Sequence, residues 1–179
     1  MKVSVVIPFM AIDEEKYEVL NQTLNSFTGA DEIIVVDNWK AGYAVPINFG
    51  LSQATGDFLI VMNDDLQWDG GSLKRLCDPE AVTSPMVNGQ SQSFWGCAFC
   101  LPRWVYEKTD GLFEGYRISY FDDEDFWNTL EQLEIPHYCK EEVAVQTTGG
   151  RTLERFPDRN AFFEENHALY NQRWPHKQK

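Results

Sequence analysis

The first part of the chain alternates between short apolar runs and longer amphipathic stretches. Three apolar, β-branched runs predict buried strands, and two stretches between them predict helices; in chain order these five segments are 2–9, 13–27, 31–38, 46–56 and 57–62. Asp13 is a candidate N-cap for the first helix, and Pro46 and Gly56 bound the second. This order is typical of a parallel sheet, so we predict an α/β fold with a mostly parallel central sheet flanked by helices.

The rest of the chain is less regular but continues to alternate. It predicts a strand, a short helix closed by Gly111, a longer helix, a last strand and a C-terminal helix, at 93–102, 103–111, 120–134, 135–145 and 159–174. No internal repeat, low-complexity segment or linker divides the sequence. Since 179 residues suffice for one substantial core, we expect a single domain over residues 1–179.

Charge narrows the classes of partner. The chain has 15 basic and 28 acidic residues, a formal net charge of −13, which argues against nucleic acid and anionic membranes. A phosphorylated ligand would therefore need a bound cation to neutralise much of its charge. No apolar run approaches the roughly 20 residues that span a bilayer. The N-terminal apolar run is short and lacks a small-residue cleavage site, so we interpret it as a strand and expect a cytoplasmic protein.

The four cysteines form no complete metal motif. Cys97 and Cys100 have C-x-x-C spacing, but a single pair lacks the second half of a zinc site, and aromatic residues surround this one. We expect buried, reduced thiols, with a metal or redox role as the alternative.

Distinctive residues follow the predicted buried strands. Pro8 closes the first strand, Asp37 closes the second, and Asp64 and Asp65 follow the third after Asn63. Because ligands of parallel sheets bind beyond the carboxyl ends of the strands, these residues mark the predicted binding edge. Adjacent carboxylates can hold a hard cation such as Mg²⁺ or Mn²⁺, which typically bridges nucleotide phosphates. The alternative for this pair is an Asx-turn.

Two further acidic features are candidates for chemistry. A carboxylate at Asp37 can accept the N3–H of uracil or thymine, which cytosine lacks, although a capping or turn aspartate is the alternative. The run "FDDEDFW" at 121–127 holds four acids among aromatic residues, and partial burial would raise the pKa of one of them. A general base needs such a carboxylate, whereas a solvated helix start is the commoner role of a charge run.

Basic residues and histidines provide fewer candidates for a catalytic or binding role. The motifs H-E-x-x-H and G-x-S-x-G and the P-loop are absent, and the three histidines are scattered. Arg151 and Arg155 follow "TTGG", where they could reach a diphosphate, with a surface role as the alternative.

In order and together, these segments resemble a family 2 glycosyltransferase of the GT-A fold. The family's opening strand is matched by "VSVVIPF", its uridine-binding strand end by "EIIVVDN", and its path into a D-x-D-type metal motif by "AGYAVPINFGLSQATGDFLIVMNDD". The segment leading to the family's "GGFDE" is matched by "GCAFCLPRWVYEKTDGLFE", its "ED-x-D" motif by "FDDEDFWNTL", and its frequent "Y-x-x-K-W" by "ALYNQRWP". The resemblance covers nearly the whole chain, which makes it more specific than any single motif.

The resemblance implies a metal-dependent sugar transfer, usually with inversion, from a nucleotide diphosphate donor (UDP- or dTDP-linked by preference) to an acceptor hydroxyl. It implies that Asp123 is the catalytic base, that Asp65 is the principal ligand of Mn²⁺ or Mg²⁺, and that Asp64 supports the metal and the sugar or ribose. The remaining residues that it places in substrate binding are Pro8, Asp37, Asn48, Gly96, Asp122 and Arg151. It divides the chain into a nucleotide-binding half, 1–66, and an acceptor-side half, 67–179.

Two departures from the family pattern and two rival functions accompany this resemblance. The family often has a histidine after its last strand, where this chain has "VQTTGGRT", so metal binding would be weaker or helped by His167. Ile47 stands before Asn48, where arginine is frequent. One rival is a nucleotidyltransferase, which would want a basic, glycine-rich loop in place of "PFMAIDEEK". The other is a non-catalytic domain of the same fold that binds a sugar nucleotide or a partner protein.

Overall fold

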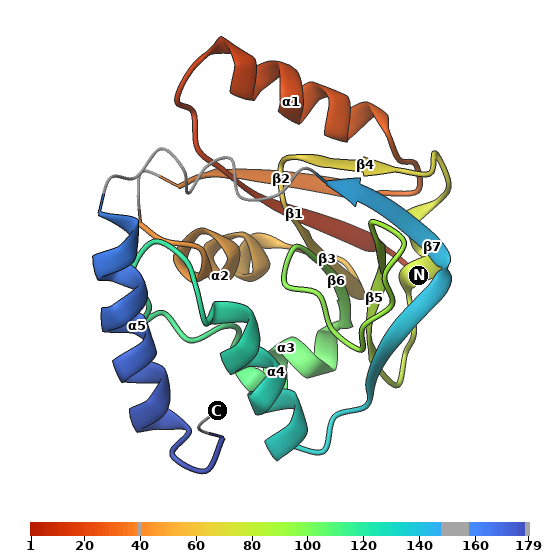
Figure 1. Cartoon of the computed structure of the whole chain (residues 1–179). Helices are drawn as coiled ribbons and strands as arrows, with labels where there is room; N and C mark the ends of the chain where they lie inside the picture. The colour runs from red at the N-terminus through yellow and green to blue at the C-terminus, as the bar shows by residue number, and fades with distance from the viewer. Residues whose placement is uncertain (39–40, 148–157, 178–179) are drawn as a thin grey trace.

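A mixed sheet with helices on both faces organises the chain (Figure 1). The computed structural model describes residues 1–38, 41–147 and 158–177, and in this part of the chain seven strands have the order β2-β1-β3-β6-β5-β7-β4. The strands are β1 (Val3–Phe9), β2 (Glu32–Asp37), β3 (Phe58–Met62), β4 (Leu66–Trp68), β5 (Val82–Val87), β6 (Ala98–Pro102) and β7 (His137–Thr147). The helices are α1 (Glu14–Asn25), α2 (Ala44–Gln53), the 3₁₀ helix η1 (Leu73–Leu76), α3 (Arg103–Thr109), α4 (Asp122–Gln132) and α5 (Arg159–Arg173).

Strand direction confirms the predicted mostly parallel sheet. Among the described strands, β1, β2, β3, β5 and β7 run the same way, whereas β6 and β4 are antiparallel to their neighbours. The register pairs Phe9 with Asp37, so the carboxyl ends of β1 and β2 lie side by side. The parallel block β2-β1-β3 therefore presents its strand ends along one edge.

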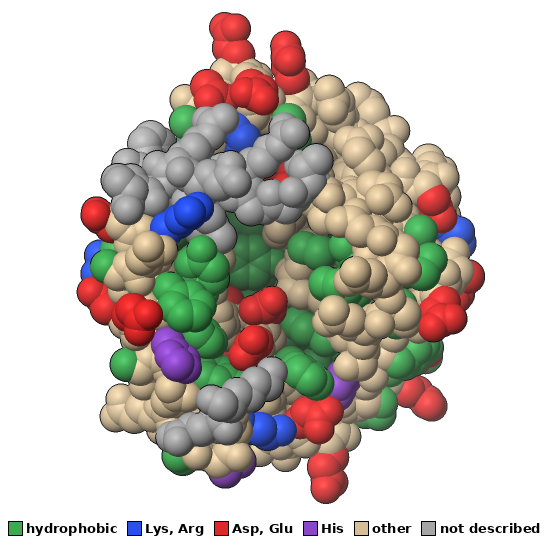
Figure 2. All heavy atoms as spheres, in the orientation of Figure 1, with side chains coloured by type: hydrophobic (Ala, Val, Ile, Leu, Met, Phe, Trp, Pro, Cys, Tyr) green, Lys and Arg blue, Asp and Glu red, His purple; other side chains and the backbone are tan. Residues whose placement is uncertain are grey.

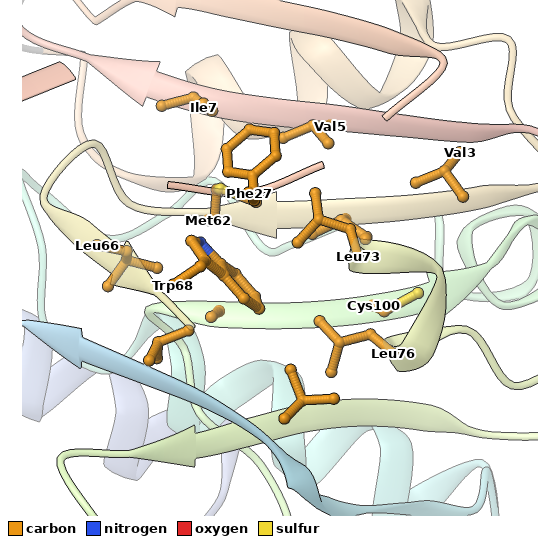
Figure 3. Close-up of a cluster of buried hydrophobic side chains, with 14 of the residues drawn as sticks. Val3, Val5, Ile7, Phe27, Met62, Leu66, Trp68, Leu73, Leu76 and Cys100 are labelled. Carbon is orange, nitrogen blue, oxygen red and sulfur yellow. The ribbon is translucent and has the colours of Figure 1, made fainter. Parts of the chain in front are cut away.

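Alternate residues of the central strands supply two separate cores. Ile7 and Met62 belong to the core that is covered by α1, β4 and η1, where Trp68 packs against the sheet (Figure 3). Val6 and Val61 face the opposite way, into the core that is covered by α2, α3 and α4. Burial on both faces explains why these strands read as continuous apolar runs.

The predicted helices are found, with shifts at their ends. Asp13 caps α1 by accepting the N–H of Lys16 at 3.0 Å. Helix α2 starts at Ala44, two residues before the predicted Pro46, and ends at Gln53. Proline is tolerated in the first helical turn, where its missing N–H has no intrahelical partner to lose. Helices α3, α4 and α5 and strand β7 lie where the pattern predicts them.

Three elements were not predicted, and one strand is shorter than expected. Strand β4 has only three residues, η1 has four, and β5 contains Pro85, which ordinarily argues against a strand. The register between β5 and β7 shifts between Pro85 and Met86, so the proline sits at an irregularity. Strand β6 begins at Ala98, five residues after the predicted start, because the Ala98 N–H bonds back to Trp95 in a turn.

Two bulk expectations concern cysteines and membranes. All four cysteines are free thiols; Cys100 is buried, and the other three are half-buried. Of the helices that the structure describes, none is long and apolar enough to cross a membrane.

Candidate functional site

The carboxyl ends of β2 and β3 carry the predicted acidic residues. Asp37 ends β2 and is exposed, and Asp64 and Asp65 follow β3 by two and three residues. The Asn63 N–H donates to the Cys97 carbonyl at 2.9 Å, which joins the end of β3 to the start of β6. The two aspartates are thereby brought beside the Gly96–Cys97 segment.

Adjacent Asp64 and Asp65 have different surroundings. The Lys16 ammonium of α1 lies 2.8 Å and 3.0 Å from the two carboxylate oxygens of Asp64, and both residues are buried. Burial raises the pKa of Asp64, while the hydrogen bond and the charge of Lys16 act in the opposite direction. The Thr23 hydroxyl also donates to the Asp64 carbonyl at 2.8 Å. Asp64 therefore fastens α1 to the end of β3.

Asp65 has no such partner. Its Oδ1 is buried and accepts no hydrogen bond from any residue that the structure describes. Burial raises the pKa of the Cys97 thiol to about 12, with further contributions from the charges of Asp65 and then Asp123. Asp65 and Asp123 thus both lie near the Cys97 thiol.

The acids at the start of α4 include a buried carboxyl group. Burial raises the pKa of Asp122 to about 8, and Asp123 adds to the rise. Both Asp122 oxygens are buried without a full hydrogen bond from the described residues. The N–H of Ala44, at the start of α2, is close enough to lower this pKa slightly, although its geometry falls short of a full bond. The starts of α2 and α4 therefore meet at Asp122.

Asp123 lies directly over Gly96. A Cβ added to Gly96 would collide with the Asp123 Cβ and come within 2.9 Å of its Oδ2, so a side chain at position 96 would displace the carboxylate. Solvent reaches Asp123, but protein atoms surround it, and this desolvation raises its pKa. The expected rise in pKa is thus found at both Asp122 and Asp123.

Tyr43 lies among these acids and was not singled out from the sequence. Its hydroxyl donates to the Gly96 carbonyl. Burial raises its pKa most, followed by Cys97, Asp123, Asp122 and Asp65 in decreasing order. The residue before a helix seldom attracts notice in a sequence, which is why its place in the site was missed.

The fourth acid of the run, Asp125, has a structural role. Its buried carboxylate accepts from Arg173 Nε at 2.8 Å, from the Tyr116 hydroxyl at 2.7 Å and from Trp174 Nε1 at 2.9 Å. The C-terminal motif that includes Arg173 and Trp174 thus docks α5 onto α4. This explains the presence of both motifs without assigning Asp125 to chemistry.

Two other predicted residues, Asn48 and Pro8, are packed within the protein. Asn48 is engaged with the loop after α3, donating to the Leu112 carbonyl at 2.7 Å and accepting from its N–H at 2.8 Å. Pro8 is buried within β1. Arg151 lies outside the described residues. Exposed His167, on α5, stacks on Phe121 at 5.4 Å between ring centroids.

Figure 2 shows acidic side chains gathered in a hollow on one face of the molecule. Hydrophobic side chains flank the hollow, and the red acidic atoms lie inside it. Low-dielectric walls around carboxylates strengthen their interaction with a bound cation.

Comparisons of the sequence and of the structure both find similar proteins. The family model described as "Glycosyl transferase family 2" matches residues 34–80. Among solved structures, a Drosophila β1,4-galactosyltransferase 7 catalytic domain covers 84% of this chain at 15% identity (TM-score 0.60). The Pyrobaculum calidifontis mannosyltransferase PcManGT, solved with GDP-Man and Mn²⁺, covers 99% at 13% identity (TM-score 0.62). S. aureus TarS, solved with UDP-GlcNAc, covers 87% at 14% identity (TM-score 0.61).

This chain has the GT-A glycosyltransferase fold. The family model confirms the resemblance to family 2 over residues 34–80, and the solved structures confirm the fold. The chain spans 66%, 65% and 61% of the lengths of those three structures. A comparison with curated protein sequences finds no significant match.

A divalent cation fits this GT-A site in one specific way. Among the described residues no group of three or more His, Cys, Asp or Glu side chains is arranged to hold a metal ion. Asp65 nevertheless offers a buried carboxylate oxygen that accepts no hydrogen bond from the described part of the chain. Since Mg²⁺ is commonly held by one or two carboxylates together with substrate phosphates, Asp65 fits a cation that is shared with a bound diphosphate.

Proposed function

We propose that this chain is a metal-dependent glycosyltransferase that moves a sugar from a nucleoside diphosphate donor to an acceptor hydroxyl, with inversion. The observation that carries the proposal is the placement of Asp65 and Asp123. Asp65 has a buried oxygen, after a strand end, without a hydrogen bond from the described residues. Asp123 has a raised pKa and lies over Gly96, and both aspartates are near the Cys97 thiol. The GT-A fold and the nucleotide sugars bound to similar structures support this assignment.

Donor binding belongs to the strand ends. Asp37, exposed at the end of β2, would accept the N3–H of a uracil or thymine base. Asp65 would hold the cation, which when bound would neutralise the charge of the leaving diphosphate. We assign the coordinating role to Asp65 and a supporting role to Asp64, because Lys16 holds the Asp64 carboxylate. With 28 acidic residues and a net charge of −13, the chain itself supplies little positive charge for phosphates.

Proton transfer belongs to the start of α4. Asp123 would accept the proton of an acceptor hydroxyl as the hydroxyl oxygen attacks the anomeric carbon of the sugar. The bond from that carbon to the diphosphate oxygen breaks on the opposite face, and the diphosphate leaves with the bonding electrons. A raised pKa suits this role because a base is most effective when its pKa is near the working pH.

The proposal is tested by donor turnover. Purified protein is incubated with a panel of UDP-, dTDP- and GDP-sugars, with Mn²⁺, with Mg²⁺ or with EDTA, and release of the nucleoside diphosphate is measured. We expect release from a UDP- or dTDP-sugar in the presence of metal and none with EDTA. Metal-dependent binding without release, even when a panel of saccharide acceptors is added, would instead identify a non-catalytic domain that binds sugar nucleotides.

A further inference from the structure

The backbone immediately before α4 has an unusual conformation. Ile118, Tyr120 and Phe121 have φ angles of 63°, 84° and 70°. Non-glycine residues seldom adopt positive φ, and a β-branched residue such as Ile118 does so at a particular cost. Such conformations persist when the surrounding structure fixes them. Phe121 directly precedes Asp122, so whatever fixes this segment also sets the direction of the acids.

One side chain of α5 bonds to this segment at four points. Asn166, 2% exposed, donates from Nδ2 to the carbonyls of Arg117 and Ser119, both at 2.9 Å, and to that of Tyr120 at 3.4 Å. Its Oδ1 accepts the Arg117 N–H at 2.9 Å. A side-chain amide is well suited to this position, because it offers two N–H donors and a carbonyl acceptor on one short stem.

Helix α5 is attached to α4 by other contacts. Arg173 and Trp174 bond to the Asp125 carboxylate, and the Asn128 amide donates to the Tyr170 hydroxyl at 2.8 Å. None of these three bonds involves the backbone of 117–121. Helix α5 is therefore fixed to α4 by bonds that do not depend on residues 117–121. Asn166 bonds to this segment from α5.

Because of this geometry, we propose that Asn166 is a positioning residue that holds residues 117–121 so that Asp122 stays beside Ala44 and Asp123 stays over Gly96. The inference rests on the proposed function, in which Asp123 is the base. Asn166 lies on α5 and acts through the backbone of the segment, since the four bonds described above all go to Arg117, Ser119 and Tyr120. Its loss should lower turnover and leave nucleotide binding intact.

The test uses Asn166→Ala and Asn166→Asp in the full chain. The alanine variant removes all four contacts, and the aspartate variant keeps the acceptor while removing the Nδ2 donors. We expect turnover of the UDP-sugar panel to fall roughly 10²-fold, since a displacement of about 1 Å in a reacting group has an effect of that size. Affinity for UDP with Mn²⁺ should stay at the wild-type value. Hydrogen exchange over 113–124 should become faster, a readout that needs no activity.

Tyr170→Phe is the matched control. It lies one turn further along α5, and the change removes the buried bond to Asn128 while keeping the ring that packs on Phe121. A second control, Glu165→Gln, breaks the exposed ion pair with Arg117. Both should keep wild-type turnover and wild-type exchange over 113–124.

Several results would overturn the inference. One is wild-type turnover in the Asn166 variants, and another is an equal loss in Tyr170→Phe, which would reduce Asn166 to general support of α5. If the alanine variant does not fold, the aspartate variant decides. If the wild-type protein releases no diphosphate from any donor, the proposed function fails separately, and unchanged exchange over 113–124 in the variants would still overturn the role of Asn166.

Discussion

The acidic residues of the candidate site are positioned in two different ways. Asp65 follows β3, a fully buried strand that lies between β1 and β6, so the sheet itself sets its position. Asp122 and Asp123 begin a helix after a segment with three non-glycine residues at positive φ, and Asn166 of a distant helix holds that segment. A strand end is thus positioned by its neighbours in the sheet, whereas this helix start depends on remote support.

At both the strand end and the helix start, one acid is bonded to a basic residue and another has an oxygen without a full hydrogen bond from the described residues. At the strand end Asp64 is bound by Lys16 while Asp65 retains an unpartnered oxygen. At the helix start Asp125 is bound by Arg173 and Trp174, while Asp122 lacks a full hydrogen bond from the described residues. In each place one aspartate is used for attachment, and another has an oxygen without a full hydrogen bond from the described residues.

The largest expected effect is on turnover at the helix start. Asp123→Asn keeps the shape of the side chain and removes the base, so turnover of the UDP-sugar panel should fall about 10²–10⁴-fold while UDP binding persists. Glu124→Gln, the adjacent exposed acid, removes the same charge and should leave turnover unchanged. Wild-type turnover in Asp123→Asn would move the base to another acid of the run.

The next effect is on stability at the strand end. Lys16→Met leaves Asp64 buried without its ion-pair partner, and the free energy of unfolding should fall by about 3–5 kcal/mol. Urea denaturation measures this. Lys74→Met is the control, because its pair with Asp31 is exposed and should contribute less than about 1 kcal/mol. Equal losses in the two variants would show that Asp64 is not held as described.

A smaller effect concerns pH. Because the pKa of Asp122 is raised to about 8 in the folded protein, folding is favoured when this group is protonated, and stability is lost as pH rises from about 4 to about 8. Asp122→Asn should therefore reduce the fall in unfolding free energy between pH 5 and pH 8 by roughly 2–4 kcal/mol. Urea denaturation at both pH values, with Glu124→Gln as control, measures it. An unchanged pH dependence would mean that Asp122 is more solvated than its burial indicates.

The smallest effect tests the base. If Asp37 accepts the N3–H of the donor base, UDP should bind more tightly than CDP by roughly 1–3 kcal/mol, since cytosine would present an acceptor to an acceptor. Calorimetry of both nucleotides with Mn²⁺ measures the difference. In Asp37→Ala the preference should disappear; equal affinities in the wild-type protein would contradict the assignment.

Sequence patterns predict the acids at the strand ends far better than the contacts that position the start of α4. Strands β1, β2, β3, β6 and β7 and the five α-helices follow from local hydrophobic periodicity, which also places the acids at the strand ends. The predicted N-cap at Asp13 is confirmed. Lys16 is only 7% exposed, although it is a charged residue of a helix. Its partner Asp64 is 48 residues away, so no local pattern predicts this burial. Asn166 is 49 residues from Arg117, and no local pattern marks such a contact.

The same limit explains the missed elements. Strand β5 is held by its pairing with β7, and this pairing tolerates Pro85 where local propensity would not. Tyr43 acquires its place among the acids because α2 and α4 start beside each other, and their sequence separation hides this. The sequence thus identified the acids as candidates. The structure shows that Asp64 and Asp125 are bonded to basic residues, whereas Asp65 and Asp122 have oxygens without a full hydrogen bond from the described residues.

The central claim is that Asp65 serves the metal and donor while Asp123 serves proton transfer. The most direct measurement is calorimetric titration of UDP, with and without Mn²⁺, into wild type, Asp65→Asn and Asp123→Asn, each shown to be folded. The account predicts Mn²⁺-dependent UDP binding in wild type and Asp123→Asn, and its loss in Asp65→Asn. Mn²⁺-dependent binding that survives in Asp65→Asn, or that is lost in Asp123→Asn, would contradict this division of roles.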